Sequence, residues 1–228
     1  MEWPRHCFKA YDIRGFSANE IDDNFAYRLG QAYATYLDCR TIAVGRDIRE
    51  SSPGLTKNLI EGLMSSGVKV LDIGIVSTGC LYHACWTLPV DGGIMVTASH
   101  LPMPTHNGFK MCRGKLPLAG EEIQELMHVF LSGDFKEEEG EHVDYPHMYT
   151  YLDAIVESTG PLTRQVKVAV DCGNAVPGKA MVELLEMLGV AHVDLYCDWD
   201  PTEPNHGADP TRPTNMVDPG EAVVEPSC

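Results

Sequence analysis

The sequence predicts an α/β fold: an α/β/α sandwich domain with a mainly parallel sheet, followed by a partial second α/β domain. Helical and strand patterns alternate as far as residue 131, as they do in a parallel sheet covered by helices. A charged run with two glycines interrupts this alternation at 133–144, and the alternation restarts over 146–196. We therefore place domain one at 1–144 and domain two at 145–228.

The elements of the first domain are predicted from apolar spacing and capping residues. Asn19 is placed to cap a helix whose apolar residues recur at spacings of three and four up to Tyr36. The Ser-Ser-Pro sequence at 51–53 is typical of a helix start, and this second helix should end near Gly67. Further helices are expected at 79–88 and 119–131, and short apolar strands at 41–44, 68–73 and 94–96.

The second domain has a weaker pattern than the first. We expect the charged run at 133–144 to be a solvated linker, because such a composition cannot bury apolar area. The stretch at 198–228 is rich in proline and acids, and it has almost no periodicity, so we expect an extended loop or disorder. Two strands make a marginal sheet, which is why this domain is called partial. Its expected elements are a helix at 146–158, a strand at 166–170, a turn at 173–178 that opens a helix ending at 188, and a strand at 190–196.

The charge balance limits the classes of partner. A formal net charge of -16 argues against nucleic acid and anionic membrane surfaces, because both require basic patches. It does not argue against an anionic small substrate, since a local cluster of arginine and lysine can override the overall sign. No apolar run approaches the ~18 residues of a membrane span. We therefore expect binding to neither nucleic acid nor membrane.

Cysteine and histidine usage bears on metals and on the cellular compartment. The eight cysteines show no CxxC spacing, and the nine histidines show no HxxxH or HxH spacing, so spacing alone indicates no zinc or histidine site. Reduced, mostly buried thiols are typical of an intracellular protein. The first residues resemble neither a signal peptide nor a transit peptide. We expect a cytoplasmic protein, with a plastid location left open.

Polar motifs follow two of the predicted strands, at the carboxyl ends where parallel sheets gather ligands. The segment Thr97–His100 follows the strand at 94–96, and Gly45–Asp47 follows the strand at 41–44. Ser99 occupies the position of a nucleophile held at a strand end. Its neighbour His100 would point away from it on an extended segment, so the two are not expected to form a direct acid–base pair. On these residues alone, a nucleophile and a polar turn both remain open.

Arg14 and Arg46 are candidate phosphate ligands, because a planar guanidinium can bind two phosphate oxygens. The alternative is that each arginine pairs with a nearby aspartate and holds a loop. The turn at 173–178 precedes a predicted helix, as phosphate-binding turns do. It has neither the GxGxxG pattern nor Walker spacing, which favours a simple strand-to-helix turn.

Five motifs, in this order, resemble those of the α-D-phosphohexomutase family, the phosphoglucomutases and phosphomannomutases. They are KAYDIRG, VGRDIRESS, TASHLPMPTHNGFK, DCGNAVPG and DPTEPNHGADPTRPTN, and the resemblance runs from about Phe8 to Glu225. It implies a protein of several domains around a deep cleft, of which this chain holds the first domain and most of the second. One departure lies beside Ser99, where Leu101-Pro102 replaces the Asn-Pro of many members; we interpret it as a branch difference.

The resemblance also implies residue roles. Ser99 matches the phosphorylated serine, which donates its phosphoryl group to a sugar phosphate and receives the other phosphate back from the bisphosphorylated sugar. His100 and Lys110 match positions that handle protons at the sugar hydroxyl, and Arg14 matches the arginine near the transferring phosphate. The substrate- and phosphate-binding residues expected on the same basis are Tyr11, Arg46 and Asn107.

The expected cofactor is Mg²⁺, which the family binds through a phosphoserine oxygen, here that of Ser99, and through the aspartates of a DGDGDR loop. No DGDGDR sequence occurs among the 228 residues. Ser99 alone offers too few hard ligands for this ion, and the substrate-positioning parts of later domains are missing. We therefore expect a truncated gene product, a fragment or a natural short form, inactive alone.

The predicted function is intramolecular phosphoryl transfer between the 1- and 6-positions of a hexose phosphate, with glucose or mannose phosphate as substrate. Hexose phosphate and hexose bisphosphate are the expected ligands. The alternative is a non-catalytic short form that binds a phosphosugar or a protein partner. An exposed apolar edge on the unfinished second domain would also favour self-association.

Overall fold

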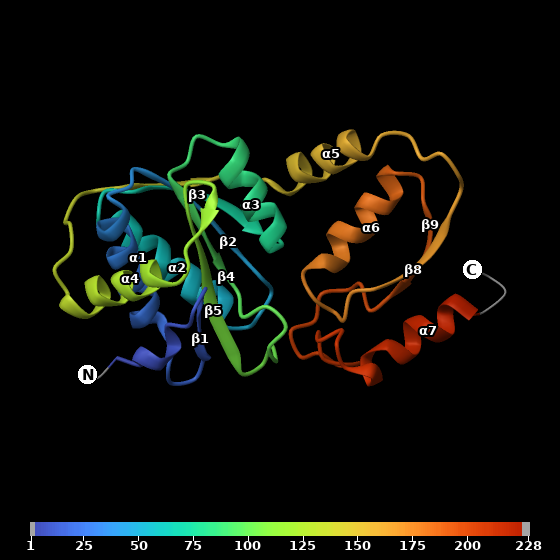
Figure 1. Cartoon of the computed structure of the whole chain (residues 1–228), viewed down its shortest axis with the longest axis horizontal. Coiled ribbons are helices and arrows are strands. Elements are labelled where there is room, and N and C mark those ends of the chain that lie inside the picture. Colours follow the sequence, from blue (N-terminus) through green and yellow to red (C-terminus); the bar gives the residue numbers. More distant parts are fainter. Residues whose placement is uncertain (1–2, 225–228) are drawn as a thin grey trace.

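The computed structural model describes residues 3–224 and contains two α/β units joined near residue 145 (Figure 1). The strands of the first unit are β1 (Ile13–Phe16), β2 (Thr41–Arg46), β3 (Lys69–Ile75), β4 (Gly92–Val96), β5 (His106–Arg113), β6 (Leu116–Pro117) and β7 (Glu141–Asp144). They form one sheet in the order β1-β5-β4-β2-β3-β7, with β6 paired to β5. The pairs β4–β2, β2–β3 and β3–β7 are parallel, whereas the pairs β1–β5, β5–β4 and β5–β6 are antiparallel.

Helices cover both faces of this sheet, so the expected sandwich with a mainly parallel sheet is confirmed (Figure 1). Their bounds are η1 (Arg5–Cys7), α1 (Asp23–Leu37), α2 (Ser52–Met64), α3 (Thr78–Thr87) and α4 (Glu121–Ser132). Asp22, and not Asn19, caps α1: its side chain accepts a 2.8 Å hydrogen bond from the Phe25 backbone N–H. The antiparallel strands β1, β5 and β6 were not among the predicted elements.

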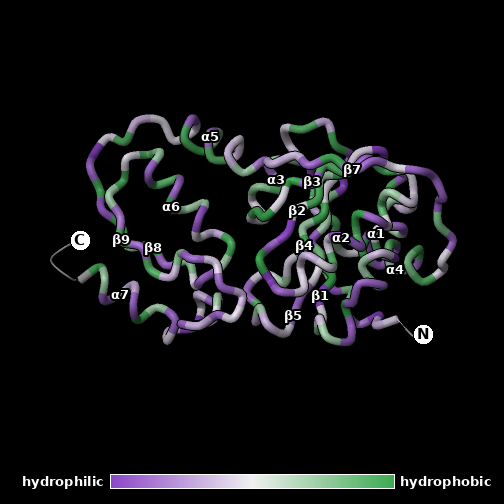
Figure 2. The backbone as a smooth tube through the Cα atoms, turned by 180° about the vertical axis from the view of Figure 1, so that it is seen from behind, coloured by the Kyte–Doolittle hydropathy of each residue, from purple (hydrophilic) through white to green (hydrophobic). Residues whose placement is uncertain are grey.

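Strand alternation divides the apolar residues between two cores. Ile42, Val44, Ile94 and Val96 point toward α1, α2 and α4 and join the larger core, which also holds Phe25 and Phe130. Their neighbours Ala43 and Met95 point the other way, into a smaller core with α3. Figure 2 shows hydrophobic stretches along both strands and helices of this unit. No helix within residues 3–224 has the length and apolar character to cross a bilayer.

Two glycines allow α1 and α2 to pack closely. A Cβ on Gly62 would collide with the Tyr27 carbonyl oxygen, and one on Gly30 would collide with the Leu59 carbonyl oxygen. The backbones of the two helices therefore meet directly at these positions, where a side chain would force them apart.

The charged run at 133–144 is not wholly a linker. Its last residues form β7, which extends the sheet by pairing in parallel with β3, with Val143 beside Leu71. Lys69 and Glu141 form a 2.9 Å ion pair across the same two strands. Backbone hydrogen bonds and cross-strand charge pairing thus hold an edge strand that carries little apolar surface.

The second unit contains a sheet of two parallel strands, β8 (Lys167–Asp171) and β9 (Ala191–Leu195). Both strands are only partly buried, which agrees with a sheet of marginal size. The prediction of a loop at 198–228 was wrong in part, because a short helix and α7 follow one another there; residues 225–228 lie outside the described residues. The helices of this unit are α5 (Met148–Thr159), α6 (Pro177–Met187), η2 (Pro213–Met216) and α7 (Val217–Val224).

Candidate active site

Ser99 is exposed on the loop that follows β4, and its backbone has the left-handed conformation, with φ 59°. A non-glycine residue adopts this conformation at a cost of roughly 1–2 kcal/mol, so other contacts must hold it there. One of these is local: the Ser99 N–H donates a 3.0 Å hydrogen bond to Thr97 Oγ1. The preceding Ala98 is fully buried and anchors the loop. The fold thus presents the Ser99 hydroxyl to solvent on a constrained backbone.

Arg49 is the main contact that holds this loop. Its side chain is 1% exposed, and its Nη2 donates a 2.7 Å hydrogen bond to the Ser99 carbonyl oxygen. Its Nη1 donates to the carbonyl oxygens of Pro102 and His106, at 3.0 and 3.1 Å. A single buried guanidinium therefore binds the loop at three points, and its charge is balanced by Asp47 at 2.8 Å.

Asp47 and Asn107 extend this network toward α2. Asp47 also accepts a 2.6 Å hydrogen bond from Ser52 Oγ. Asn107 is fully buried, and its amide nitrogen donates to the hydroxyl oxygens of Ser51 and Ser52 at 2.8 and 3.0 Å. The structure thus places Asn107 in the interior as a link between β5 and the start of α2.

Arg46 lies on a different side of the sheet from the cavity described below. It is paired in register with Val96, whose side chain belongs to the larger core, so it points toward the same face as α1 and α2. Its Nη1 donates a 3.4 Å hydrogen bond to the Asp47 carbonyl oxygen. Of the two arginines in this motif, Arg49 and not Arg46 contacts the Ser99 loop.

A second charged cluster lies on β1 and β5. Arg14 Nε and Lys110 Nζ both contact Asp12 Oδ2, at 2.6 and 3.1 Å, and Asp12 is 1% exposed. The exposed Tyr11 ring lies against both cations, 5.5 Å from Arg14 Cζ and 5.2 Å from Lys110 Nζ. One carboxylate thus holds two cations together and leaves a net positive charge.

The sheet register places this cluster on the same face as the Ser99 cavity. Arg14 is paired with Gly108, and Lys110 is paired with Met95. Directly opposed residues share a face of the sheet, and Met95 also lines the cavity beside Ser99. Tyr11, Arg14 and Lys110 thus lie together around Asp12.

An interdomain cavity of about 550 Å³ separates the two units beside Ser99. The first unit contributes Ser99 and His100 to its wall. The second contributes residues from two of the sequence motifs, among them Asp171, His206 and Asp209. The two sides are joined by a 3.1 Å hydrogen bond from the Met103 backbone N–H to Glu203 Oε2. The cavity thus combines the serine loop with motifs that lie far away in the sequence.

Asp171 and His206 form a pair in the wall of this cavity, with 3.0 Å between Oδ2 and Nε2. Burial alone would lower the pKa of His206, but hydrogen bonds to the Gly207 carbonyl oxygen and to Asp171 outweigh it, so the pKa is raised. The nearby Asp209 has a lowered pKa because Thr211 donates hydrogen bonds to it, and His100 adds to the effect. The cavity therefore holds titratable groups of both signs.

Ser99 and its expected partners lie on two sides of one loop. Ser99 and His100 border the interdomain cavity. Tyr11 and Arg14 border a separate cavity of about 450 Å³, to which Leu101 and His106 of the same loop contribute.

Sequence reasoning missed Asp12, Arg49 and the Asp171–His206 pair. The YDIRG and DIRESS motifs did carry a signal for the first two, namely an acid two residues before an arginine.

The described residues do not fit a magnesium ion at Ser99. Asp47 is engaged by Arg49 and Ser52, and Asp171 by His206 and the Gly173 N–H. Within residues 3–224, ligand atoms of three His, Cys, Asp or Glu residues converge in two places, and neither includes a residue that lines the interdomain cavity.

The chain is thus an α/β protein with an exposed serine on a constrained strand-end loop and with arginine and lysine on the same face of its sheet. The family model described as phosphoglucomutase/phosphomannomutase, alpha/beta/alpha domain I, matches residues 5–137. The chain is 38% identical over 218 residues to the phosphomannomutase/phosphoglucomutase of Pseudomonas aeruginosa and 39% identical over 219 residues to the phosphoglucomutase of Neisseria gonorrhoeae. The chain belongs to the phosphoglucomutase/phosphomannomutase family.

These matches cover nearly all of this chain but only part of its relatives. Each curated relative aligns with 94% of the chain, whereas the chain spans 47% of either relative. A phosphoglucomutase/phosphomannomutase family protein from Burkholderia thailandensis has the same fold, with a TM-score of 0.92 and 35% sequence identity. That match covers 97% of the chain and 50% of the solved structure. The chain thus spans about half the length of the relatives it matches.

Proposed function

We propose that this chain carries the phosphoserine part of a hexose phosphate mutase, with Ser99 as the residue that accepts and donates the phosphoryl group. The observation that carries the proposal is the exposed Ser99, held in a left-handed conformation by the Arg49 hydrogen bond on the wall of the interdomain cavity. A rigidly positioned oxygen suits phosphoryl transfer, because catalysis of this reaction depends mainly on positioning and charge neutralisation.

The proposed reaction moves one phosphoryl group at a time. A hydroxyl oxygen of the hexose phosphate attacks the phosphorus of phosphorylated Ser99, and the bond to Ser99 Oγ breaks. The hydroxyl proton passes to a base, and the leaving Ser99 Oγ takes up a proton to become a hydroxyl. The hexose bisphosphate formed then returns its other phosphoryl group to Ser99 by the reverse step, which interconverts the 1- and 6-phosphates. Glucose and mannose phosphates are the proposed substrates.

The proposed roles of the remaining residues rest on the family resemblance and on their placement. His100 and Lys110 handle the proton, and Arg14 neutralises the transferring phosphate with Tyr11 beside it. Asn107 and Arg49 act as positioning residues, since their side chains are buried and hold the loop. The role of Arg46 as a phosphate ligand remains a prediction. Mg²⁺ as the cofactor also remains a prediction, because the described residues offer this ion little beyond a phosphate oxygen on Ser99.

Intact-mass spectrometry of the chain incubated with glucose 1,6-bisphosphate tests this proposal. We expect a gain of one phosphoryl group, located on Ser99 by peptide fragmentation, and no gain in Ser99→Ala. Ser158→Ala is the matched control, because Ser158 is an exposed serine in the second unit, and this variant should be modified like the unaltered chain. Modification at another residue, or none at all, would contradict the proposal.

A second candidate is a non-catalytic form that binds a phosphosugar or a protein partner. It is favoured by one observation, the cavity of about 550 Å³ beside Ser99, which residues of both units line. Calorimetry with glucose 1-phosphate and a pull-down distinguish the two candidates. Saturable heat of binding or a captured partner, without phosphorylation of Ser99, supports the binding function. No heat of binding and no captured partner reject it.

A further inference from the structure

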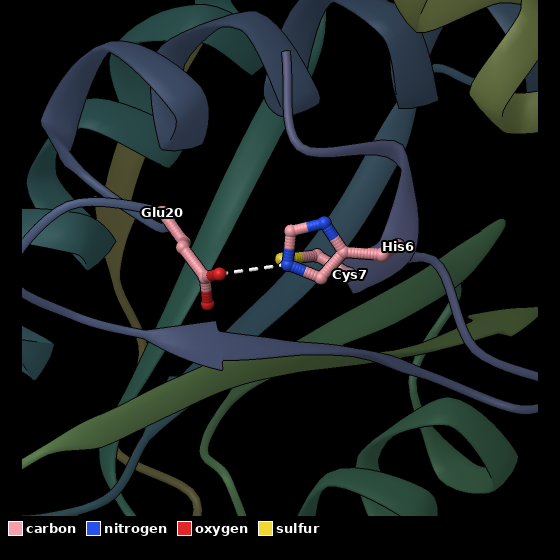
Figure 3. A group of neighbouring side chains, drawn as sticks. All are labelled: His6, Cys7 and Glu20. Atoms are coloured by element: carbon pink, nitrogen blue, oxygen red, sulfur yellow. Dashed lines mark hydrogen bonds and ion pairs between the residues drawn. The ribbon is translucent and has the colours of Figure 1, made fainter.

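A cluster of three ligand-type side chains lies near the amino terminus, outside the site described above (Figure 3). His6 and Cys7 are on η1, and Glu20 is in the loop between β1 and α1. His6 Nε2 lies 2.7 Å from Glu20 Oε1 and 3.8 Å from Cys7 Sγ. The three ligand atoms all lie within 4.8 Å of one another. Fold topology thus brings an imidazole nitrogen, a thiol sulfur and a carboxylate oxygen to one point.

The surrounding backbone leaves space for this cluster. A Cβ at Gly15 would lie 2.7 Å from Cys7 Sγ and 2.8 Å from Glu20 Oε2, so the cluster requires a residue without a side chain there. Glu20 Oε2 accepts a 2.7 Å hydrogen bond from the Phe16 N–H, which leaves Oε1 directed at His6. Cys7 is fully buried, whereas the His6 side chain is 63% exposed. Two ligands are therefore fixed, and the third can adjust.

An ion can reach the cluster from solvent. His6 and Glu20 border the 450 Å³ cavity that also contains Tyr11 and Arg14. Cys7 is fully buried and does not border this cavity, so an ion would reach it from the side of His6 and Glu20.

We propose that His6 Nε2, Cys7 Sγ and Glu20 Oε1 form a Zn²⁺ site with one position open to water. A mixed set of nitrogen, sulfur and oxygen ligands suits zinc, whereas Mg²⁺ and Ca²⁺ take oxygen ligands. Zinc–ligand distances of about 2.0–2.3 Å separate neighbouring ligands in a tetrahedron by about 3.5 Å. The His6–Cys7 separation is already close to this value. The His6–Glu20 hydrogen bond must lengthen by less than about 1 Å, which rotation of the exposed His6 side chain allows.

Zinc binding at this site releases a proton. Burial, followed by the negative charge of Glu20, raises the pKa of the Cys7 thiol to about 11, and Lys9 opposes the shift. Zinc replaces the thiol proton, which passes to solvent, and neutral His6 binds through Nε2 while keeping its proton on Nδ1. The dication and the two anionic ligands then sum to zero charge.

The site would join η1 to the loop that follows β1. Gly15, which provides the space, directly follows Arg14, so the ion would hold the backbone beside the Arg14–Asp12 pair. The proposal does not depend on the function proposed for Ser99, since none of its ligands lines the interdomain cavity.

Titration of the whole chain with Co²⁺ and Zn²⁺ tests the site. We expect one Co²⁺ per chain, with a thiolate-to-cobalt charge-transfer band that Zn²⁺ abolishes. Cys7→Ser should remove this band, and Glu20→Gln should weaken Zn²⁺ binding at least 10-fold. Cys172→Ser is the matched control, because it removes a partly buried thiol in the second unit and should leave the band unchanged.

The outcome is decided by the band and by its dependence on Cys7. Binding without a thiolate band, a band that persists in Cys7→Ser, or no binding overturns the proposal. Glu20→Gln keeps the test valid if Cys7→Ser fails to fold, since Glu20 lies at the cavity and Gln has nearly the same shape. Full-affinity zinc binding in Glu20→Gln would likewise contradict the assigned ligand set.

Discussion

Arg49 Nη2 donates a 2.7 Å hydrogen bond to the Ser99 carbonyl oxygen, which joins the motif after β2 to the loop after β4. The guanidinium is almost wholly buried and is paired with Asp47. The conformation of the serine loop therefore depends on a side chain that lies fifty positions earlier in the sequence.

Arg49→Met should strongly destabilise the first unit. The substitution keeps much of the apolar stem but leaves the buried Asp47 carboxylate without its cation, a change that costs about 3–5 kcal/mol. Urea unfolding followed by circular dichroism measures the loss. The same variant should not be phosphorylated at Ser99, because its loop loses three hydrogen bonds.

Arg46→Met is the matched control for this experiment. Arg46 belongs to the same motif but makes one long hydrogen bond to a neighbouring backbone oxygen, so its loss should cost less than about 1 kcal/mol. Equal destabilisation by the two substitutions would contradict the assignment of Arg49 as the residue that holds the loop.

Gly62→Ala should destabilise the chain by about 1–3 kcal/mol or more, because the added methyl group would collide with the Tyr27 carbonyl oxygen where α1 and α2 meet. Gly220→Ala, in α7, is the control: its added methyl group meets no atom within 4 Å. Alanine favours a helix over glycine by roughly 0.5–1 kcal/mol, so this variant should be neutral or more stable. Thermal unfolding compares the two, and a tolerated Gly62→Ala would show that the helices can separate without cost.

His147 should make stability fall as the solution becomes acidic. Burial lowers the pKa of His147, and His83, at 2.9 Å, lowers it further. The unfolded chain then binds a proton more readily than the folded chain, so stability is lost as pH falls below about 6.5 and the loss levels off below the folded pKa. Urea unfolding between pH 7.5 and roughly pH 5 should therefore show a shallower pH dependence in His147→Gln. His128→Gln, at an exposed position, should retain the dependence of the unaltered chain.

His206 should behave in the opposite sense. Its pKa is raised, so its protonation contributes stability that is present below the unfolded pKa and is lost as pH rises through the folded pKa. Asp171→Asn removes the carboxylate and should lower the pKa of His206, which an NMR titration of the imidazole resonances measures. Asp144→Asn is the control, since that carboxylate lies at the end of β7 and should leave the resonances of His206 unchanged. An unaltered titration in Asp171→Asn would remove Asp171 as a cause of the shift.

The parallel part of the fold was predictable from sequence because its strands are short, continuous apolar runs. The antiparallel strand β5 was missed, since it carries the polar residues Asn107 and Lys110, which become buried or half-buried only through tertiary partners. Helix α7 was missed because its Pro219-Gly220 sequence resembles a turn, although proline is tolerated in the first turn of a helix.

The sequence placed Ser99 and His100 after a strand, and the structure shows both exposed in the loop after β4, while their roles remain predictions. The role of Arg49 was not predictable, because its hydrogen bonds go to the backbone oxygens of Ser99, Pro102 and His106, fifty or more positions away in the sequence. Arg46 points instead toward the face of the sheet covered by α1 and α2. The His6–Cys7–Glu20 cluster was missed for a related reason: motif spacing does not detect ligands brought together by a turn and a strand.

The attachment of the second unit has a mechanical consequence. Immediately after β7, the Tyr145 N–H donates a 2.7 Å hydrogen bond to the Asp72 carbonyl oxygen, so the connecting chain leaves the first sheet from a fixed point. The Met103–Glu203 hydrogen bond makes a second attachment on the serine loop. Met148 and Tyr151 of α5 also pack against the core beneath α3, and His147 lies 2.9 Å from His83. The second unit is therefore attached to the first at several separate places, so the walls of the cavity beside Ser99 are held in position by contacts from both units.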